Sequence, residues 1–116
     1  MPEASPEPEK LLFICSLNRW RSPTAERIFD NHPHYEARSA GTEPGARVRV
    51  TAGHLGWADF IFVMERRHAD RLREKFGEEL GGKRVVVLRI PDKYRSGDSQ
   101  LVALLQHKLA EHRSLL

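Results

Sequence analysis

The single cysteine of this chain lies where its thiol could act as a nucleophile. An apolar run, Leu11–Ile14, leads directly into Cys15, and Arg21 and Ser22 follow after five intervening residues. An amphipathic segment begins at Pro23, so the stretch predicts a buried strand, a tight loop and a helix start. Loop amides and a helix N-terminus can converge on one anion, and an arginine can offer its planar guanidinium to phosphate oxygens. The spacing therefore predicts a phosphate-binding loop with Cys15 at its mouth.

Activation of this thiol would need several groups at once. A free thiol has a pKa of about 8.5, whereas a thiolate nucleophile near neutral pH needs about 5 to 6. The difference corresponds to about 4 kcal/mol, and a helix terminus alone supplies only about 0.3–2 kcal/mol. Loop N–H groups, the Arg21 charge and the Ser22 hydroxyl would have to supply the rest. The residues by themselves also allow a simpler interpretation, in which Cys15 is a buried strand residue and Arg21 a solvated charge.

Strand and helix patterns alternate four times along the chain, which is typical of an α/β protein. The predicted strands are Leu11–Cys15, Tyr35–Ser39, Phe60–Met64 and Val85–Ile90. The predicted helices are Ser22–Asn31, a short helix capped by Thr51 and running to Trp57, Glu65–Phe76 with Gly77 as its C-cap, and a last helix beginning at Asp98 or Ser99. The segment Arg47–Val50 fits either a strand or a loop, and its two arginines could approach a phosphate or be solvated. We expect a three-layer α/β/α domain with a four-stranded parallel sheet.

The length of 116 residues fits one domain with one core. We expect residues 1–9, rich in Pro and Glu, to be a disordered lead-in and residues 10–116 to form the domain. The formal charge of +3 comes from dispersed basic residues interleaved with acids, which favours a solvated surface that mildly attracts anionic substrates over a nucleic-acid-binding surface. Neither a membrane-length apolar run nor a signal-peptide pattern is present. These features predict a cytoplasmic monomer that binds neither nucleic acid nor membrane.

The cysteine and histidine content argues against a metal centre. One cysteine permits no internal disulfide and no cysteine pair for zinc. The six histidines are scattered, and no carboxylates are spaced beside them as a metal site would need. We therefore expect no metal and no other cofactor. The six positions are His32, His34, His54, His68, His107 and His112.

The stretch Cys15–Pro23, followed by Ala25 and Glu26, resembles the Cys-x-x-Asn-x-x-Arg-Ser-Pro loop of low-molecular-weight protein tyrosine phosphatases. Further stretches resemble the same family in the same order along the chain. They are Ser39–Thr42, Ala58–Met64 and Ile90–Tyr94. Together they cover most of the chain from Lys10 onward and resemble a short bacterial-type member, with fewer residues than usual around Arg47–Val50. The resemblance implies a sheet order of 2-1-3-4.

The resemblance also implies a reaction and a set of catalytic residues. Cys15 would attack the phosphorus of phosphotyrosine or another aryl phosphate to form a phosphocysteine. Arg21 and the loop amides would hold the phosphoryl oxygens, and Ser22 would stabilise the thiolate. Asp92 would protonate the leaving phenolate and then activate water. The loop that would bind phosphate or a similar oxyanion consists of Ser16, Leu17, Asn18, Arg19, Trp20, Arg21 and Ser22.

Supporting roles are implied for residues outside the loop. Ser39 would hold the loop, toward Asn18, although it could simply be a turn serine. Trp20 and Tyr94 would flank the substrate ring, or Trp20 would cover the loop and Tyr94 would lie on the surface. Asp92 could instead be a turn residue, with Asp98, itself a candidate helix cap, as the alternative acid.

The chain departs from the family pattern at three positions, and each bears on function. Leu17 stands where the family often has glycine, Trp20 where it often has a second cysteine, and Lys93 where proline usually follows the acid. Without that second cysteine, Cys15 has no intramolecular disulfide partner. Three other functions remain open: an arsenate reductase that uses an external thiol, a non-catalytic phospho-ligand binding module, and a phosphoserine phosphatase similar to the enzymes acting on the RNA polymerase tail.

Overall fold

The computed structural model describes residues 7–112 of the chain, and its centre is a parallel sheet of four strands in the order β2-β1-β3-β4. This order confirms the one implied by the resemblance. The predicted lead-in falls mostly on residues 1–6, outside the described residues, and Glu9 already belongs to the first strand. The strands are β1 (Glu9–Cys15), β2 (Tyr35–Gly41), β3 (Phe60–Val63) and β4 (Val85–Val87).

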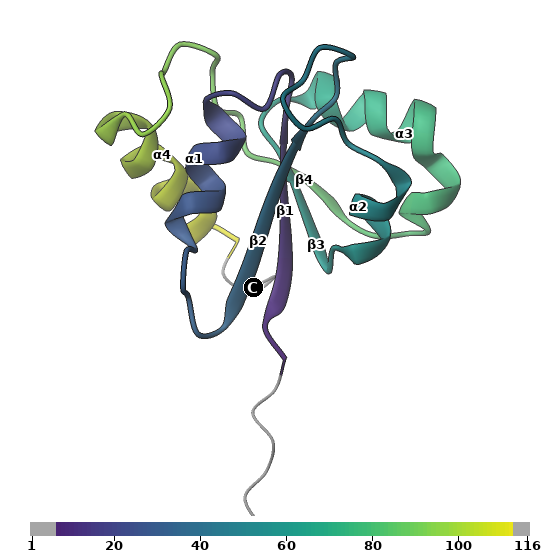
Figure 1. Cartoon of the computed structure of the whole chain (residues 1–116), viewed down its shortest axis with the longest axis horizontal. Helices are drawn as coiled ribbons and strands as arrows, with labels where there is room; N and C mark the ends of the chain where they lie inside the picture. Colours follow the sequence, from purple (N-terminus) through teal and green to yellow (C-terminus); the bar gives the residue numbers. More distant parts are fainter. Residues whose placement is uncertain (1–6, 113–116) are drawn as a thin grey trace, which may run out of the picture.

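Helices cover both faces of the sheet, as the three-layer prediction requires. In Figure 1, α1 and α4 lie on one side and α2 and α3 on the other. Within the described residues no helix is long and apolar enough to cross a membrane. The helices are α1 (Arg21–Ile28), α2 (Ala52–Trp57), α3 (Arg66–Leu80) and α4 (Ser99–Ala110).

The central strand β1 is buried on both faces, which explains its unbroken apolar sequence. Leu11 and Phe13 belong to the core cluster on the side of α1 and α4. Leu12 and Ile14 point to the other face, into the cluster formed with α2 and α3. All four are fully buried. Burial on both sides fixes the strand in position and holds Cys15, its last residue, at the carboxyl end of the sheet.

The predicted end of the third helix was wrong. Gly77 lies inside α3, which continues to Leu80 with a kink at Phe76, where φ is −126°. The C-cap is Gly81, whose φ of +53° places it in the left-handed conformation that ends many helices. The helix continues past Gly77 because Leu80 is buried against the core on the α2 and α3 side. Burial of that side chain outweighs the modest cost of one glycine in a helix.

Other boundaries differ from the sequence expectations by a few residues. α1 ends at Ile28 rather than Asn31, and β4 ends at Val87 rather than Ile90. The ambiguous segment Arg47–Val50 contributes one isolated parallel bridge, between Arg49 and Gly41. The predicted cap of α2 is confirmed, since the Thr51 side chain accepts a hydrogen bond from the His54 amide.

Candidate active site

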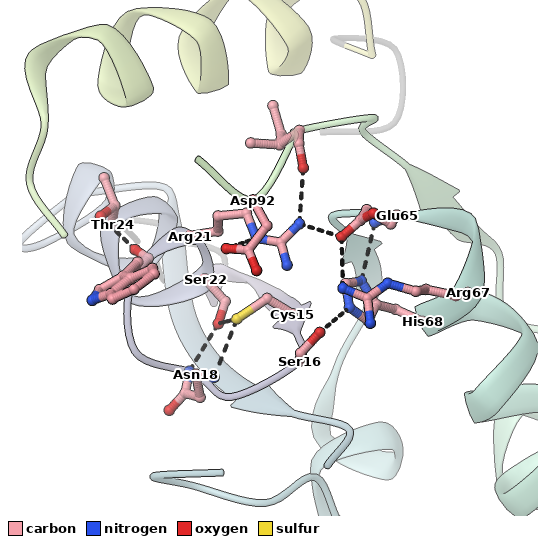
Figure 2. Close-up of polar contacts among 12 residues, drawn as sticks. Cys15, Ser16, Asn18, Arg21, Ser22, Thr24, Glu65, Arg67, His68 and Asp92 are labelled. Carbon is pink, nitrogen blue, oxygen red and sulfur yellow. Dashed lines mark hydrogen bonds and ion pairs between the residues drawn. The ribbon is translucent and has the colours of Figure 1, made fainter. Parts of the chain in front are cut away.

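The predicted loop joins the carboxyl end of β1 to the first residue of α1, Arg21. Asn18 has a φ of +55°, a left-handed conformation that asparagine tolerates better than most residues. This turn brings the Asn18 amide within 3.2 Å of Cys15 Sγ, to which it donates. Ser22 Oγ lies 2.9 Å from the same sulfur. Figure 2 shows the dashed lines that join the sulfur to these two groups.

A cavity of about 80 Å³ lies over the thiol. Its rim carries Leu17 and Trp20, which are 40% and 44% exposed, whereas Cys15 below them is only 3% exposed. The structure therefore brings most of the predicted loop together with one predicted acid. The lining consists of Cys15, Ser16, Leu17, Arg19, Trp20, Arg21 and Asp92.

Gly41, at the end of β2, allows the strand to pass close to the loop. A Cβ atom added there would lie 2.4 Å from Ser16 O and 2.7 Å from Ala46 Cβ. Contacts that short cannot be accommodated without moving the backbone. The Thr42 amide also donates to Cys15 O, and the Glu43 amide donates to Ser16 O. The Ser-Ala-Gly-Thr stretch thus supports the loop from the side of β2.

Arg21 is held rigidly at the edge of the cavity. Its side chain is 2% exposed, and Nη1 donates to Glu65 Oε2 at 2.6 Å and to Ile90 O at 2.9 Å. Its Nε lies 3.6 Å from Asp92 Oδ1. An arginine has five N–H groups, so the three on Nε and Nη2 can serve a bound oxyanion. Figure 2 shows the guanidinium between Asp92 and Glu65.

Glu65 is a site residue that the sequence reasoning missed. It follows β3 and caps α3, and it also accepts a hydrogen bond from Arg67 Nη2 at 3.0 Å. Partial burial would raise its pKa, but hydrogen bonds from Arg67 and Arg21 outweigh burial and hold the pKa at about 2. Glu65 therefore stays anionic beside Arg21. Its place just after a parallel strand, at the edge where sites form, was the available signal.

His68 is the second site residue that the sequence reasoning missed, and it contacts Ser16 in the loop. Its ring is 1% exposed, and Nδ1 accepts the Glu65 amide at 3.1 Å. Nε2 therefore carries the proton and donates to Ser16 Oγ at 2.9 Å. Burial, followed by the nearby charges of Arg21 and Arg67, lowers the pKa of His68 to about 4. A neutral His68 thus connects α3 to the loop.

Asn18 connects the loop to β2 and α1. Its side chain is fully buried, and Nδ2 donates to Ser22 Oγ and to Ser39 Oγ, both at 2.9 Å. Ser39 in turn donates to Glu26 Oε1 at 2.5 Å. The structure thus places Ser39 against Asn18, in the position that the resemblance assigned to it.

The two candidate acids and the two candidate aromatic residues lie at different distances from the cavity. Asp92, half exposed, lines the cavity beside Arg21. Asp98 lies away from it and caps α4, accepting the Gln100 amide at 2.7 Å. Tyr94 is not among the residues that line the cavity, and its partly buried ring packs against the core on the α1 and α4 side. Of the two predicted aromatic residues, only Trp20 reaches the cavity.

No group of three or more potential metal ligands occurs among residues 7–112. The arrangement that is present has different chemical capacities. It combines a buried sulfur with two polar neighbours, a fixed guanidinium and a solvent-accessible carboxyl group around one small cavity. Such a set can bind a tetrahedral oxyanion, attack its central atom and exchange a proton with a leaving group.

Comparison with known proteins points in the same direction. The chain is 31% identical to the low molecular weight protein-tyrosine-phosphatase Wzb of Escherichia coli K12, over 81% of this chain and 84% of that protein. It is 28% identical to a protein-arginine-phosphatase of Geobacillus stearothermophilus, over 61% of this chain and 64% of that protein. No protein-family model matches the chain.

A solved structure shows the same fold. The tyrosine phosphatase Wzb from Escherichia coli K30, in complex with phosphate, superposes with a TM-score of 0.74 at 23% identity. The match covers 95% of this chain and 99% of that one. The layers and strand order described above are therefore those of known phosphatase structures.

Proposed function

Because this chain belongs to the low molecular weight protein tyrosine phosphatase family, we propose that it hydrolyses phosphotyrosine through a phosphocysteine on Cys15. The observation that carries this proposal is the position of Cys15 at the floor of the cavity. Its sulfur accepts a hydrogen bond from the main-chain N–H of Asn18 and lies 2.9 Å from the Ser22 hydroxyl. A thiolate has no proton, so toward it Ser22 can only donate, and the anionic sulfur would then receive two stabilising hydrogen bonds.

In the first step, the Cys15 thiolate attacks the phosphorus in line with the tyrosine oxygen. The S–P bond forms and the P–O bond to the phenolate breaks. The loop amides and the free edge of Arg21 bind the three equatorial oxygens. Asp92 gives its proton to the departing phenolate, which has a pKa of about 10 and leaves poorly as an anion.

In the second step, water attacks the phosphocysteine. Asp92, now a carboxylate, takes a proton from that water as the new P–O bond forms and the S–P bond breaks. Inorganic phosphate leaves, and the thiolate returns to its two donors, Asn18 N–H and Ser22 Oγ. A catalytic thiolate requires a reducing compartment, so we place the reaction in the cytoplasm.

The rim of the cavity supports an aromatic substrate. Trp20 and Leu17 expose apolar surface on which a phenyl ring can pack. Arg19 also lines the cavity, and its charge would oppose the positive guanidinium portion of a phosphoarginine. The relatives found are phosphatases, so arsenate reduction is not part of the proposal. Phosphoarginine remains the competing substrate, because one relative is a protein-arginine-phosphatase.

The proposal is tested by turnover of 4-nitrophenyl phosphate and of a phosphotyrosine peptide over a range of pH, without added metal. Wild type should hydrolyse both. Cys15→Ser should retain phosphate binding and lose turnover, because serine lacks a thiolate but leaves the cradle intact. Turnover by Cys15→Ser at the wild-type rate would refute the proposal. A phosphoarginine peptide, assayed in parallel, decides between the two substrates.

A further inference from the structure

A chain of hydrogen bonds runs beneath the loop from Glu26 on α1, through Ser39 and Asn18, to Ser22 and Cys15. We propose that Glu26 is a positioning residue that fixes the direction of this chain, so that the Ser22 proton is not taken by Asn18 and is left for the nearby sulfur. The inference rests on the proposed function, in which that sulfur is the nucleophile. Glu26 is not among the residues that line the cavity, and its hydrogen bond goes to Ser39 rather than to the sulfur.

The direction is set at the Glu26 end. An ionised carboxylate has lone pairs but no proton, so it can only accept a hydrogen bond. Ser39 has one hydroxyl proton, and it gives that proton to Glu26 Oε1 at 2.5 Å. Toward Asn18, therefore, Ser39 Oγ can only accept. The charged acceptor makes this bond stronger than one between two neutral groups.

The side-chain amide group of Asn18 is then fixed in one of its two possible orientations. Nδ2 must face Ser39, and its second proton goes to Ser22 Oγ at 2.9 Å. In the reverse orientation Asn18 Oδ1 would need a hydrogen bond from the Ser39 hydroxyl, but that hydroxyl already donates to Glu26. As a consequence, Asn18 Oδ1 has no hydrogen-bond partner, and it is the one such buried side-chain atom among the described residues. An orphaned carbonyl is costly, and the direction of the chain accounts for it.

The last link follows from the same proton count. Ser22 Oγ accepts from Asn18, which leaves its own proton for an acceptor. Two acceptors are in reach, Cys15 Sγ at 2.9 Å and Ala40 O at 3.4 Å, and the nearer one is the sulfur. The main-chain N–H of Asn18 also donates to the sulfur, at 3.2 Å, so the sulfur then accepts two hydrogen bonds. Hydrogen bonds donated to a group favour its charged form.

The variant Glu26→Gln separates this effect from simple electrostatics. Removing a negative charge near a thiolate would, by Coulomb attraction and repulsion alone, make the thiolate form at lower pH. The proposal predicts the opposite, because a glutamine can donate to Ser39 and free the chain to reverse. We expect the midpoint of thiolate formation in Glu26→Gln to be about one pH unit higher than in wild type. At any pH below both midpoints, the variant would then have about a tenfold smaller thiolate fraction than wild type.

Thiolate formation is followed by ultraviolet absorbance against pH, with Cys15→Ser as the blank, and by the rate of iodoacetamide alkylation. Asp30→Asn is the matched control, since Asp30 is an exposed acid just after α1 and outside the chain of hydrogen bonds. Its midpoint should equal that of wild type. Circular dichroism and thermal melts check that each variant is folded.

Ser39→Ala is the second test, and it decides the matter if Glu26→Gln does not fold. It keeps the Glu26 charge and removes the link, so Asn18 can turn its Oδ1 toward Ser22 and take that proton. The midpoint should again rise. A midpoint that stays unchanged or falls in the folded variant overturns the role of Glu26. An ordinary thiol titration in wild type would instead refute the proposed nucleophile, so the two failures are distinguishable.

Discussion

Arg21 and Glu65 form a hydrogen-bonded ion pair in which Arg21 Nη1 lies 2.6 Å from Glu65 Oε2. The pair joins the first residue of α1 to the N-cap residue of α3, two positions after the end of β3. Arg21 is 2% exposed and Glu65 33%, so water competes weakly for the guanidinium. The cation is therefore in place before any phosphate binds, and it need not reorganise during the reaction.

Glu65→Gln should lower kcat/KM for an aryl phosphate by about 10- to 100-fold, because a displaced Arg21 no longer matches the equatorial oxygens. Steady-state kinetics measure the loss. Arg67→Met is the control, since it removes the other cation on Glu65 and leaves the Arg21 pair intact. Its kinetics should stay near wild type. Equal activity of Glu65→Gln and wild type would show that Arg21 does not depend on this tether.

Asp92→Asn should reduce kcat/KM most for substrates with poor leaving groups. An amide cannot supply a proton, and the missing general acid costs about 10²- to 10⁴-fold where the leaving group needs one. A series of aryl phosphates with different phenol pKa values gives the slope. Asp98→Asn should behave like wild type, because Asp98 caps α4. The same loss across the whole series, or a slope change in Asp98→Asn, would argue against Asp92 as the acid.

His68 should make the protein less stable as pH falls from about 6.5 to about 4. Its pKa is about 4 in the folded state against an ordinary 6.5, so in this window the unfolded chain binds a proton that the folded chain does not. The loss amounts to roughly 3 kcal/mol across the window. In urea unfolding between pH 7 and 4.5, His68→Gln should lose less stability than wild type. Parallel curves for the two proteins would contradict a neutral, buried His68.

Lys83 should stabilise the end of α2. Its Nζ donates to three main-chain carbonyl oxygens, those of Leu55 at 2.7 Å, Gly56 at 3.1 Å and Ala58 at 2.7 Å. Lys83→Met should lower the free energy of unfolding by about 2 kcal/mol, since these carbonyls lose a charged donor. Arg84→Met, which removes the neighbouring exposed cation, should have little effect. Equal stabilities of the two variants in urea would contradict the role of Lys83.

The sequence was informative where local chemistry decides the structure. The apolar run before Cys15 and the proline at position 23 locate a strand, a loop and a helix start, and the structure has all three. Gly77 was misleading because a glycine signals a helix end only weakly, and burial of Leu80 extends the helix past it. A local pattern cannot show that kind of tertiary contact.

The supporting residues of the site were harder to predict for a similar reason. Glu65 and His68 lie 44 and 52 positions from their partners Arg21 and Ser16. Only the packing of α3 beside the loop brings them together. For Tyr94 the sequence left two positions open, beside the substrate ring or on the surface, and in the structure its partly buried ring packs on the core. The position of the Tyr94 ring depends on the path of the chain after β4.

The most direct test of the account is whether a phosphoryl group becomes attached to Cys15 during turnover. Wild type and Asp92→Asn are mixed with an aryl phosphate, denatured within milliseconds and examined by intact mass and by peptide mapping. We predict a mass increase of one phosphoryl group on the peptide that contains Cys15, accumulating most in Asp92→Asn with a good leaving group, because hydrolysis of the intermediate lacks its base. Turnover with no phosphorylated Cys15, or a phosphoryl group attached elsewhere on the chain, would contradict the account.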